Sequence, residues 1–359
     1  MIIEEILELA ISQKASDIHI SANLPPVLRV DGKLIRTTLP VLSADDVETV
    51  IFPILSNDQR RELEQNWELD FGYGLKGLGR FRVNVYKDKG AYAAAFRTIN
   101  STPPNFEELG LPEVVKKVAE RPRGLILVTG PTGSGKSTTL AAMIDYINNN
   151  RVEHILTIED PIEFIHQSKK CVIHQRELGQ DTKAIANALK SALREDPDVI
   201  LVGEMRDLET TRLALTAAET GHLVLGTLHT SSASQTIDRI VDIFPEVQQQ
   251  QVRLQLSISL VAVFSQTLLP RLQPDGTKKG RIMAQEIMLV NAAIANLIRE
   301  QKTAQIYSAI QTGVGSGMHT LDMCLKDLVD RKLVDPLDAI TKSQRPDEFK
   351  RTLGLANLT

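Results

Sequence analysis

The spacing of apolar residues along the chain changes character near residue 100. Ile and Leu residues between positions 3 and 11 recur at helical spacing, which predicts an amphipathic helix. From 68 to 99 apolar and polar residues alternate, so that Phe81, Val83 and Val85 would share one face of a strand. The pattern therefore predicts a small α+β unit, whose strands form a meander with one buried face.

Two further signals refine this first unit. The segment 27–35 alternates around the pair Asp31-Gly32, which tolerates positive φ, and it therefore predicts a β-hairpin. Ser43 and Ser56 each precede a helical stretch, where a serine hydroxyl can accept a hydrogen bond from the first turn. We expect a helix to begin directly after each of these serines.

Later in the chain, strand-like and helical patterns alternate. Continuous apolar runs, typical of strands buried on both faces, occupy 125–129, 155–158, 199–202 and 223–228. Amphipathic patterns lie between them, at 136–149, 182–195 and 208–220. This order predicts an α/β fold with a mainly parallel sheet and helices on both faces. After Val290 the pattern is helical to the last residue.

The chain of 359 residues is long enough for about two domains. Pro103, Pro104 and Pro112 mark the change of pattern, and adjacent prolines favour an extended, stiff connection. The predicted division is an N-terminal domain at 1–100, a linker at 101–112, an α/β core at 113–290 and a helical C-terminal portion at 291–359.

Charge and cysteine content exclude some classes of function. Lys and Arg number 41 against 45 Asp and Glu, a net charge of −4. Because sequence-independent DNA binding needs a basic tail or domain, we expect no nucleic-acid partner. Cys171 and Cys324 lie far apart, which excludes a disulfide scaffold and a four-cysteine zinc site.

The N-terminus and the hydropathy indicate a cytoplasmic protein. Glu4 and Glu5 stand where a signal peptide would carry Lys or Arg. The densest apolar run, ISLVAVF, is flanked by Ser and Gln and falls far short of the roughly 18 residues of a membrane span. We expect no direct insertion into a membrane.

The strongest chemical signal is GPTGSGKST, which fits the phosphate-binding pattern G-x-x-x-x-G-K-[ST] between an apolar strand and an amphipathic helix. Glycines allow successive N–H groups to face one anion at a helix N-terminus. Lys136 would reach the β- and γ-phosphates, and Ser137 would bind Mg²⁺. The predicted ATP site consists of Gly130, Pro131, Thr132, Gly133, Ser134, Gly135, Lys136, Ser137 and Thr138.

Acidic residues follow two of the predicted strands. Glu204 stands at the carboxyl edge of the sheet, where it could orient or deprotonate an attacking water. Glu159, Asp160 and Glu163 follow another strand, and like charges gathered beside phosphates favour a shared cation. We expect Mg²⁺ there, directly or through water. A solvated acidic loop is the alternative.

Basic residues supply further candidates for the site. His229 falls at the expected end of a strand, where it could sense the γ-phosphate or contact Glu204, and a satisfied core histidine is the alternative for it and for His222. With no third ligand at a suitable spacing, zinc is not indicated. An arginine that reaches the γ-phosphate accelerates such reactions. The candidates on strands of the first domain are Arg80, Arg82 and Arg97, for which a solvated surface position is the alternative. Closer to the phosphate loop in sequence, the competitors for this role are Lys190, Arg194 and Arg206.

Gly72, Gly74 and Gly77 fit a second pattern, the dinucleotide fingerprint G-x-G-x-x-G. That motif must end a strand and open a helix, whereas residues 80–85 alternate as a strand immediately afterwards. We expect a glycine-rich bend between strands and no nicotinamide cofactor.

Taken together, these motifs resemble the PilT-type retraction ATPases of type IV pili, within the secretion and pilus ATPase superfamily. The similar segments are ASDIHI, RVDGKL, GRFRVN, the phosphate loop, TIEDPIE, VGEMRDLET and TAAETGHLVLGTLHT. The last three occur together, in this order, in essentially no other P-loop family. The resemblance implies a RecA-like P-loop ATPase core, a PAS-like N-terminal α+β domain, a helical C-terminal portion and a homohexameric ring.

The resemblance also implies roles for single residues. Catalysis falls to Glu204, Arg82, Arg97 and His229, and metal binding to Ser137, Glu159, Asp160 and Glu163. The implied activity is ATP hydrolysis that powers pilus retraction and twitching motility, from the cytoplasmic base of the pilus machine at the inner membrane. An inner-membrane platform protein is the implied partner, and a paralogous retraction ATPase is a further candidate.

Other activities stay open beside this one. The chain could be an accessory retraction motor, an extension or secretion ATPase of the same superfamily, or a RecA-like nucleic-acid translocase. The segment AIANLIRE, 293–300, is close to the AIRNLIRE of the retraction branch and departs from it at Ala295.

Overall fold

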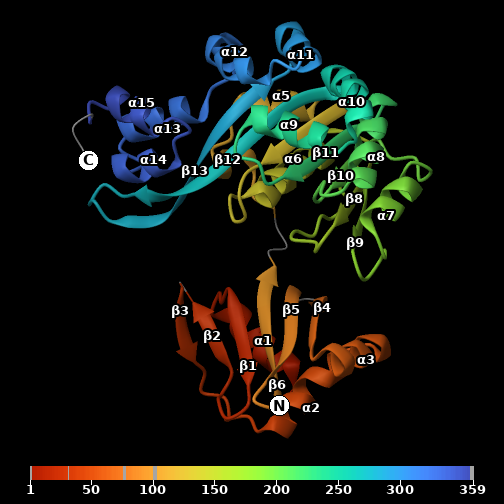
Figure 1. Cartoon of the computed structure of the whole chain (residues 1–359). Helices are drawn as coiled ribbons and strands as arrows, with labels where there is room; N and C mark the ends of the chain where they lie inside the picture. Colours follow the sequence, from red (N-terminus) through yellow and green to blue (C-terminus); the bar gives the residue numbers. More distant parts are fainter. Residues whose placement is uncertain (1, 31, 76–77, 100–102, 356–359) are drawn as a thin grey trace. The chain divides into compact units, whose positions relative to one another are not determined.

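The chain folds into two compact units. The computed structural model describes residues 2–30, 32–75, 78–99 and 103–355 (Figure 1). One unit comprises Met1–Thr102 with Pro161–Ile165, and the other comprises Pro103–Asp160 with His166–Thr359. Each unit has its own hydrophobic core.

The first unit is a six-stranded antiparallel sheet covered by helices, in the order β3-β2-β1-β6-β5-β4. Its elements are α1 (Ile3–Ser12), β1 (Asp17–Ser21), β2 (Val27–Val30), β3 (Lys33–Arg36), α2 (Ala44–Ile51), the 3₁₀ turn η1 (Phe52–Ile54), α3 (Asn57–Asn66), β4 (Glu68–Leu75), β5 (Gly79–Asp88) and β6 (Ala91–Ile99). Phe81, Val83 and Val85 are fully buried in one core cluster with residues of α1 and α2. The predicted α+β unit with one buried face is confirmed.

Local signals in this unit act as their chemistry predicts. The Ser43 hydroxyl accepts a hydrogen bond from the Asp46 N–H at 3.1 Å, and the Ser56 hydroxyl accepts one from the Gln59 N–H at 3.2 Å, so α2 and α3 begin where expected. The predicted hairpin is β2–β3, and its turn residue Asp31 lies outside the described residues.

The prediction of a glycine-rich bend was wrong for two of its three glycines. Gly72 and Gly74 lie inside β4, opposite Arg82 and Arg80 of β5, because a ladder of main-chain hydrogen bonds does not depend on the side chain. Gly77 lies outside the described residues. A strand and not a helix follows, which a dinucleotide motif does not allow.

The second unit is built on a seven-stranded sheet in the order β13-β12-β7-β11-β10-β8-β9, which is parallel except for β13. Its strands are β7 (Gly124–Thr129), β8 (His154–Glu159), β9 (Val172–Glu177), β10 (Val199–Val202), β11 (Leu223–Leu228), β12 (Leu260–Leu272) and β13 (Lys278–Leu289). Its helices are α4 (Phe106–Leu109), α5 (Glu113–Ala119), α6 (Lys136–Asn150), α7 (Ile185–Ala192), α8 (Leu208–Glu219), α9 (Ala233–Asp242), α10 (Glu246–Ser259), α11 (Ala292–Arg299), α12 (Ile306–Thr312), α13 (Leu321–Asp330), α14 (Pro336–Lys342) and α15 (Pro346–Thr352), with the 3₁₀ turns η2 (Thr303–Gln305) and η3 (Val314–Ser316).

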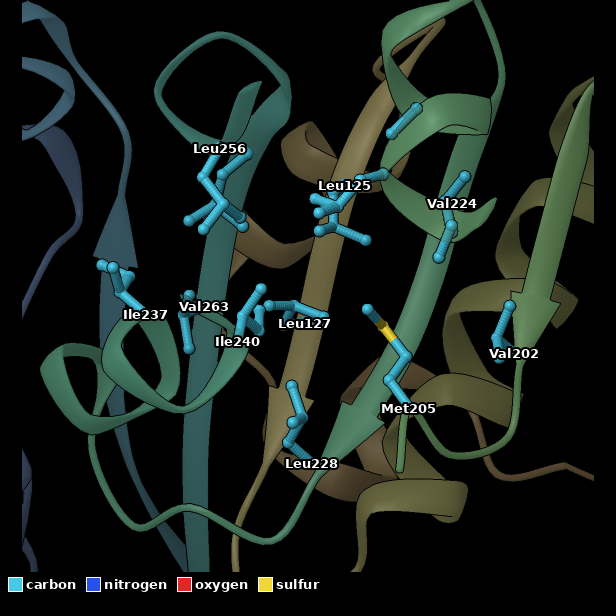
Figure 2. Packing of buried hydrophobic residues seen from close by; sticks show 14 of the residues in the cluster. Leu125, Leu127, Val202, Met205, Val224, Leu228, Ile237, Ile240, Leu256 and Val263 are labelled. Carbon is cyan, nitrogen blue, oxygen red and sulfur yellow. The ribbon is translucent and has the colours of Figure 1, made fainter. Parts of the chain in front are cut away.

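Both faces of this sheet are covered, because alternate residues of each central strand point to opposite sides. Leu125 and Leu127 of β7 pack in one cluster with Ile237 of α9 (Figure 2). Ile126 and Val128 pack in another cluster with residues of α5 and α6. The result is three layers, helix on sheet on helix, as the predicted α/β class requires.

Three strands were not predicted. β12 follows α10 with no loop between them, so no turn signal separates the helix from the strand. The buried polar residues Ser265, Gln266 and Thr267 then interrupt its apolar pattern, and β13 completes the hairpin. β9 is a polar strand at the sheet edge. The elements described after Leu289 are helices and 3₁₀ turns, as predicted, except for an isolated β-bridge between His319 and Ile287.

Part of the predicted linker is folded. Residues 106–109 form helix α4, whose Asn105 cap accepts a hydrogen bond from the Glu108 N–H at 2.8 Å. Phe106 and Leu111 are buried in the core of the second unit. The prolines suggested an extended connection, but burial of these two apolar side chains determines the conformation instead. Residues 100–102 lie outside the described part of the chain.

The buried carboxylate of Glu286 on β13 accepts hydrogen bonds from two separate segments of the second unit. Glu286 is 1% exposed, and it accepts hydrogen bonds from the Ala233 N–H at 2.8 Å and from the Gln344 amide at 3.1 Å. Ala233 is the first residue of α9, and Gln344 lies between α14 and α15. Burial raises the pKa of Glu286 above its ordinary value, and these hydrogen bonds offset only part of that effect.

Glu286→Ala is expected to lower the free energy of unfolding by about 1–3 kcal/mol, because buried donors lose their acceptor. Because the pKa of Glu286 is higher in the folded protein than its ordinary value of 4.5, this group contributes stability in full below pH 4.5. That contribution is lost as the pH rises through the folded-state pKa. The advantage of the wild type should therefore be largest at acid pH, as measured by urea denaturation at several pH values. Glu300→Ala, at an exposed ion pair with Lys302, is the control. Equal midpoints for wild type and Glu286→Ala at every pH would contradict this role.

Candidate active site

The loop between β7 and α6 encloses a lysine ammonium group. Lys136 Nζ donates to the carbonyl oxygens of Gly130 at 2.9 Å and Pro131 at 3.2 Å. Gly130 has φ +140°, and a Cβ there would lie 2.2 Å from the main-chain oxygen of Gln266, so only glycine fits. Gly135, with φ +88°, caps α6. The context that the motif requires, a buried strand, a tight loop and a helix, is present.

These residues fit a polyphosphate ligand. The first N–H groups of α6 have no partner within the helix and lie at the positive end of its dipole. Lys136 adds a full positive charge at the same place. The side chain of Ser134 is buried, and its hydroxyl has no hydrogen-bond partner among the described residues. Ser137 lies in the first turn of α6, and its hydroxyl is the candidate ligand for a magnesium ion beside such a phosphate.

Glu204 is held in place by its two neighbours in the sequence. The Gly203 N–H donates to the Ile158 carbonyl at 2.8 Å, and the Met205 N–H donates to the Thr227 carbonyl at 3.1 Å. The Thr227 hydroxyl also donates to the Gly203 carbonyl. Main-chain contacts on both sides thus fix the segment to β8 and β11, so Glu204 stands at the carboxyl edge of the sheet, as predicted.

An arginine and a histidine contact the Glu204 carboxylate. Arg206 Nε lies 2.6 Å and His229 Nε2 3.0 Å from the same oxygen. Burial opposes ionisation of Glu204, but the hydrogen bonds from Arg206 and His229 outweigh it and hold its pKa below the ordinary value. The carboxylate is therefore ionised at neutral pH and can accept a hydrogen bond from water. The predicted contact between His229 and Glu204 is confirmed.

A pocket of about 450 Å³ opens beside this carboxylate. Its lining residues are Glu204, Met205, Arg206, Leu228, His229, Thr230 and Arg239. Sequence reasoning missed Arg239, which is exposed on α9, the helix that follows His229. The signal that could have found it is a lone basic residue on the polar face of a helix that begins beside a candidate catalytic histidine.

The three acidic residues that follow β8 fall in different units, Glu159 and Asp160 in the second and Glu163 in the first. Glu159 Oε1 accepts hydrogen bonds from the Thr157 hydroxyl at 2.7 Å and from the Gln175 amide at 3.2 Å, while Asp160 and Glu163 are exposed. In the described part of the chain, no three His, Cys, Asp or Glu side chains form a metal-binding group. A magnesium site on these carboxylates therefore stays a prediction.

His222 lies at the other edge of the sheet, before β11, away from Glu204. Its Nδ1 is 3.0 Å from the Ala217 carbonyl of α8, and its own carbonyl accepts a hydrogen bond from the Gly124 N–H at 3.0 Å. These contacts fit the alternative reading of a locally satisfied histidine.

Arg82 and Arg97 lie opposite each other on β5 and β6 of the first unit. Arg97 Nε donates to Asp17 of β1 at 2.9 Å, and Arg29 lies 3.7 Å from the same carboxylate. Burial opposes ionisation of Asp17, but the hydrogen bond from Arg97 holds its pKa below the ordinary value. Arg82 is exposed beside a like charge, an arrangement that favours a bound anion.

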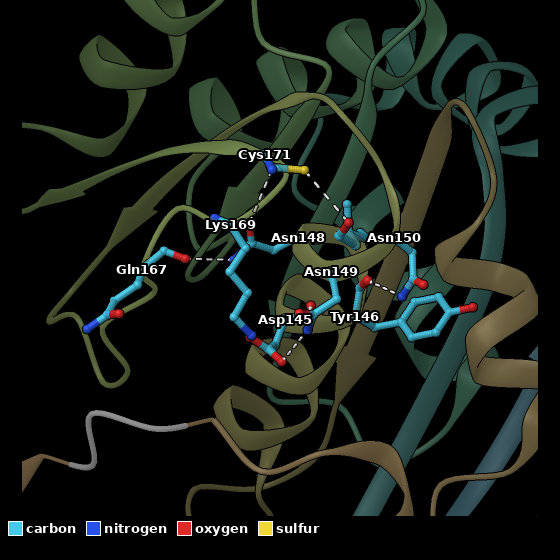
Figure 3. A network of polar contacts seen from close by, with 9 residues as sticks. Asp145, Tyr146, Asn148, Asn149, Asn150, Gln167, Lys169 and Cys171 are labelled. Atoms are coloured by element: carbon cyan, nitrogen blue, oxygen red, sulfur yellow. Dashed lines mark hydrogen bonds and ion pairs between the residues drawn. The ribbon is translucent and has the colours of Figure 1, made fainter.

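The opposite end of α6 holds the segment that leads into β9. Asn148 is fully buried, and its amide donates to the Gln167 carbonyl at 2.7 Å (Figure 3). Its carbonyl oxygen accepts hydrogen bonds from the N–H groups of Lys169 at 3.0 Å and Cys171 at 3.4 Å. Burial raises the pKa of the Cys171 thiol. One helix thus carries the phosphate loop at its start and the β8–β9 connection at its end.

The described helices include none that is both long enough and apolar enough to span a bilayer.

Known proteins match nearly the whole chain. The family model described as "Type II/IV secretion system protein" matches residues 1–319. The type IV pilus retraction ATPase PilT of Pseudomonas aeruginosa is 56% identical over 349 residues, which cover 97% of this chain and 100% of that protein. A twitching motility protein of Neisseria gonorrhoeae is 55% identical over 324 residues, which cover 90% of this chain and 86% of that protein.

Among solved structures, a crystal structure of the pilus retraction motor PilT with bound ADP has a TM-score of 0.91 and 49% identity. The similarity covers 98% of this chain and 99% of that one. It confirms the expected fold class, a RecA-like P-loop core with a PAS-like N-terminal domain and a helical C-terminal portion. The chain belongs to the Type II/IV secretion system protein family, and within it to the PilT-type pilus retraction ATPases.

Proposed function

We propose that this protein is a motor that hydrolyses ATP to power the retraction of type IV pili, and with it twitching motility. The observation that carries the proposal is that the phosphate loop lies next to the strand end that bears His229, the partner of Glu204. The Gly130 N–H donates to the Leu228 carbonyl at 3.3 Å, and His229, which contacts Glu204, follows directly. A loop suited to phosphates and a carboxylate suited to water therefore meet at one edge of a parallel sheet.

Different side chains bind the phosphates and orient the attacking water. Lys136 and the first N–H groups of α6 bind the β- and γ-phosphates and stabilise the negative charge of the transferring group. Glu204 orients the attacking water in line with the γ-phosphate, while Arg206 and His229 keep its carboxylate ionised and fixed. Mg²⁺, held by the Ser137 hydroxyl and the phosphates, would neutralise further charge when bound.

The similarity to pilus retraction ATPases supports a proposal for the assembly of this protein. We propose a homohexamer in the cytoplasm, at the inner-membrane base of the pilus machine, that acts on an inner-membrane platform protein. Residues 1–100 would serve as its PAS-like domain, and Arg82 and Arg97 would reach the nucleotide from there. A paralogous retraction ATPase is a further candidate partner, and the balanced charge argues against a nucleic-acid partner.

Deletion of the gene tests the direction of the motor. Cells that lose retraction should be hyperpiliated and should not twitch, and a plasmid copy should restore twitching. Bald cells would instead assign the protein to pilus extension. Added duplex DNA should leave the ATP turnover of the purified protein unchanged. Stimulation of turnover by DNA, with a steep salt dependence, would instead indicate a nucleic-acid translocase.

Arg82→Ala is expected to lower ATP turnover while nucleotide affinity stays close to wild type. Arginines that reach a γ-phosphate contribute roughly 10³–10⁵ in rate in related reactions. The substitution should not destabilise the first unit, because Arg82 is exposed and faces the like charge of Arg97. Steady-state kinetics and titration with a fluorescent ATP analogue separate the two effects. Unchanged kinetics would make Arg82 a plain surface residue.

A further inference from the structure

One glutamine on β12 is buried directly against the phosphate loop. Gln266 is 3% exposed, and both ends of its amide are used. Its Nε2 donates to the Ser134 carbonyl at 2.9 Å, and its Oε1 accepts a hydrogen bond from the Thr139 hydroxyl at 3.0 Å. Ser134 belongs to the loop and Thr139 to the first turns of α6, so one side chain connects the two parts of the phosphate site.

The main chain of the same residue also shapes the loop. Its carbonyl oxygen occupies the space where a Cβ at Gly130 would lie, at 2.2 Å. In addition, the side-chain nitrogen Nε2 of Gln266 lies 3.3 Å from the position that a Cβ at Gly135 would take. Gln266 thus fixes how closely the loop approaches the sheet at both glycines.

Polar groups are costly to bury unless they are hydrogen-bonded. A buried amide is stable only when its donor and its acceptor are both satisfied. An apolar residue would fill the same volume at this position without that requirement. The two contacts of the amide both go to the phosphate site, which indicates a role in that site and not in the packing of the sheet.

Ser265, the residue before Gln266, contacts the end of β7 from the other face of the sheet. The hydroxyl groups of Ser265 and Thr129 lie 2.8 Å apart, where β7 ends and the loop begins. Ser265 stands opposite Glu286, which holds the first residue of α9. The β12–β13 hairpin therefore supports the phosphate loop on one face and the helix that follows His229 on the other.

We propose that Gln266 is a positioning residue for ATP turnover. It holds the phosphate loop and the start of α6 in the conformation that binds the β- and γ-phosphates, and it acts through the Ser134 carbonyl and the Thr139 hydroxyl. The inference rests on the proposed ATPase function.

Gln266→Met keeps the volume and removes both hydrogen bonds. The dissociation constant of a fluorescent ATP analogue and the KM for ATP should rise roughly tenfold, the size expected when two such bonds are lost. The matched control is Gln273→Met on the same hairpin, because the Gln273 amide donates to the Lys279 carbonyl outside the site. Wild-type binding and turnover in Gln266→Met would overturn the proposal, whatever its unfolding temperature.

Gln266→Glu separates positioning from stability. Its ionised carboxylate can still accept the hydrogen bond from Thr139, but it places an oxygen against the Ser134 carbonyl. Protonation restores a donor, so turnover relative to wild type should recover as pH falls from 8 to about 5.5, within the range in which a buried Glu takes up a proton. A constant ratio across pH would overturn the proposal. If wild type and Gln273→Met also fail to bind the analogue, the ATPase function itself is wrong.

Discussion

Lys136→Ala is expected to abolish measurable ATP turnover and to weaken nucleotide binding strongly. The Lys136 ammonium donates hydrogen bonds to the loop carbonyls of Gly130 and Pro131, so its charge is fixed at the phosphate loop. Loss of one preorganised group of this kind costs about 10²–10³ in kcat. Phosphate release measures turnover, and calorimetric titration with ATP measures the affinity.

Lys326→Ala is the matched control for this variant. Lys326 pairs with Asp330 on the surface of α13, where an exposed ion pair contributes little. Both lysine variants should unfold at nearly the same temperature, because the hydrogen bonds that Lys136 donates to the Gly130 and Pro131 carbonyls stay within the phosphate loop. Turnover of Lys136→Ala within a few-fold of wild type would remove this loop from the site and leave the motor hypothesis without its phosphate anchor.

The phosphate loop was predictable because its chemistry is local. Nine consecutive residues carry the glycines, the lysine and the hydroxyl groups, and a buried strand and a helix flank them. Gln266 was not predictable in this way, since it lies 132 residues from Ser134 in the sequence. Only the pairing of β12 with β7 brings the two together, and β12 itself was missed because it follows α10 without a turn.

The difference between local sequence patterns and contacts made by strand pairing also applies to the acidic residues. Glu204 was found because a rule of topology places residues after parallel strands at one edge of the sheet, where His229 also arrives. For Glu159, Asp160 and Glu163, adjacency in sequence suggested a shared Mg²⁺, which stays a prediction. The side chain of Glu159 accepts hydrogen bonds from Thr157 and Gln175, and the second contact comes from a strand that the sequence pattern did not reveal.

Glu204→Gln is expected to bind ATP with nearly wild-type affinity and to lose turnover by about 10²–10⁴-fold, the contribution typical of a positioned acid or base. The amide has the shape of the carboxylate but no charge, so it orients water poorly and no longer attracts Arg206 and His229. Binding should survive because Lys136 and the start of α6 are unchanged. The same titration and phosphate-release assays separate the two effects, and Glu209→Gln, at an exposed position on α8, is the control.

The pH dependence gives this prediction a second signature. Although burial opposes ionisation of Glu204, hydrogen bonds from Arg206 and His229 hold its pKa below the ordinary 4.5. In wild type, kcat/KM should therefore stay insensitive to this group at neutral pH and fall only as pH drops through the lowered pKa. Arg206→Ala removes one donor, so the acid limb should move to higher pH, whereas Glu204→Gln should lack it. An acid limb at the same pH in Arg206→Ala and wild type would show that Glu204 is not the group whose ionisation turnover requires.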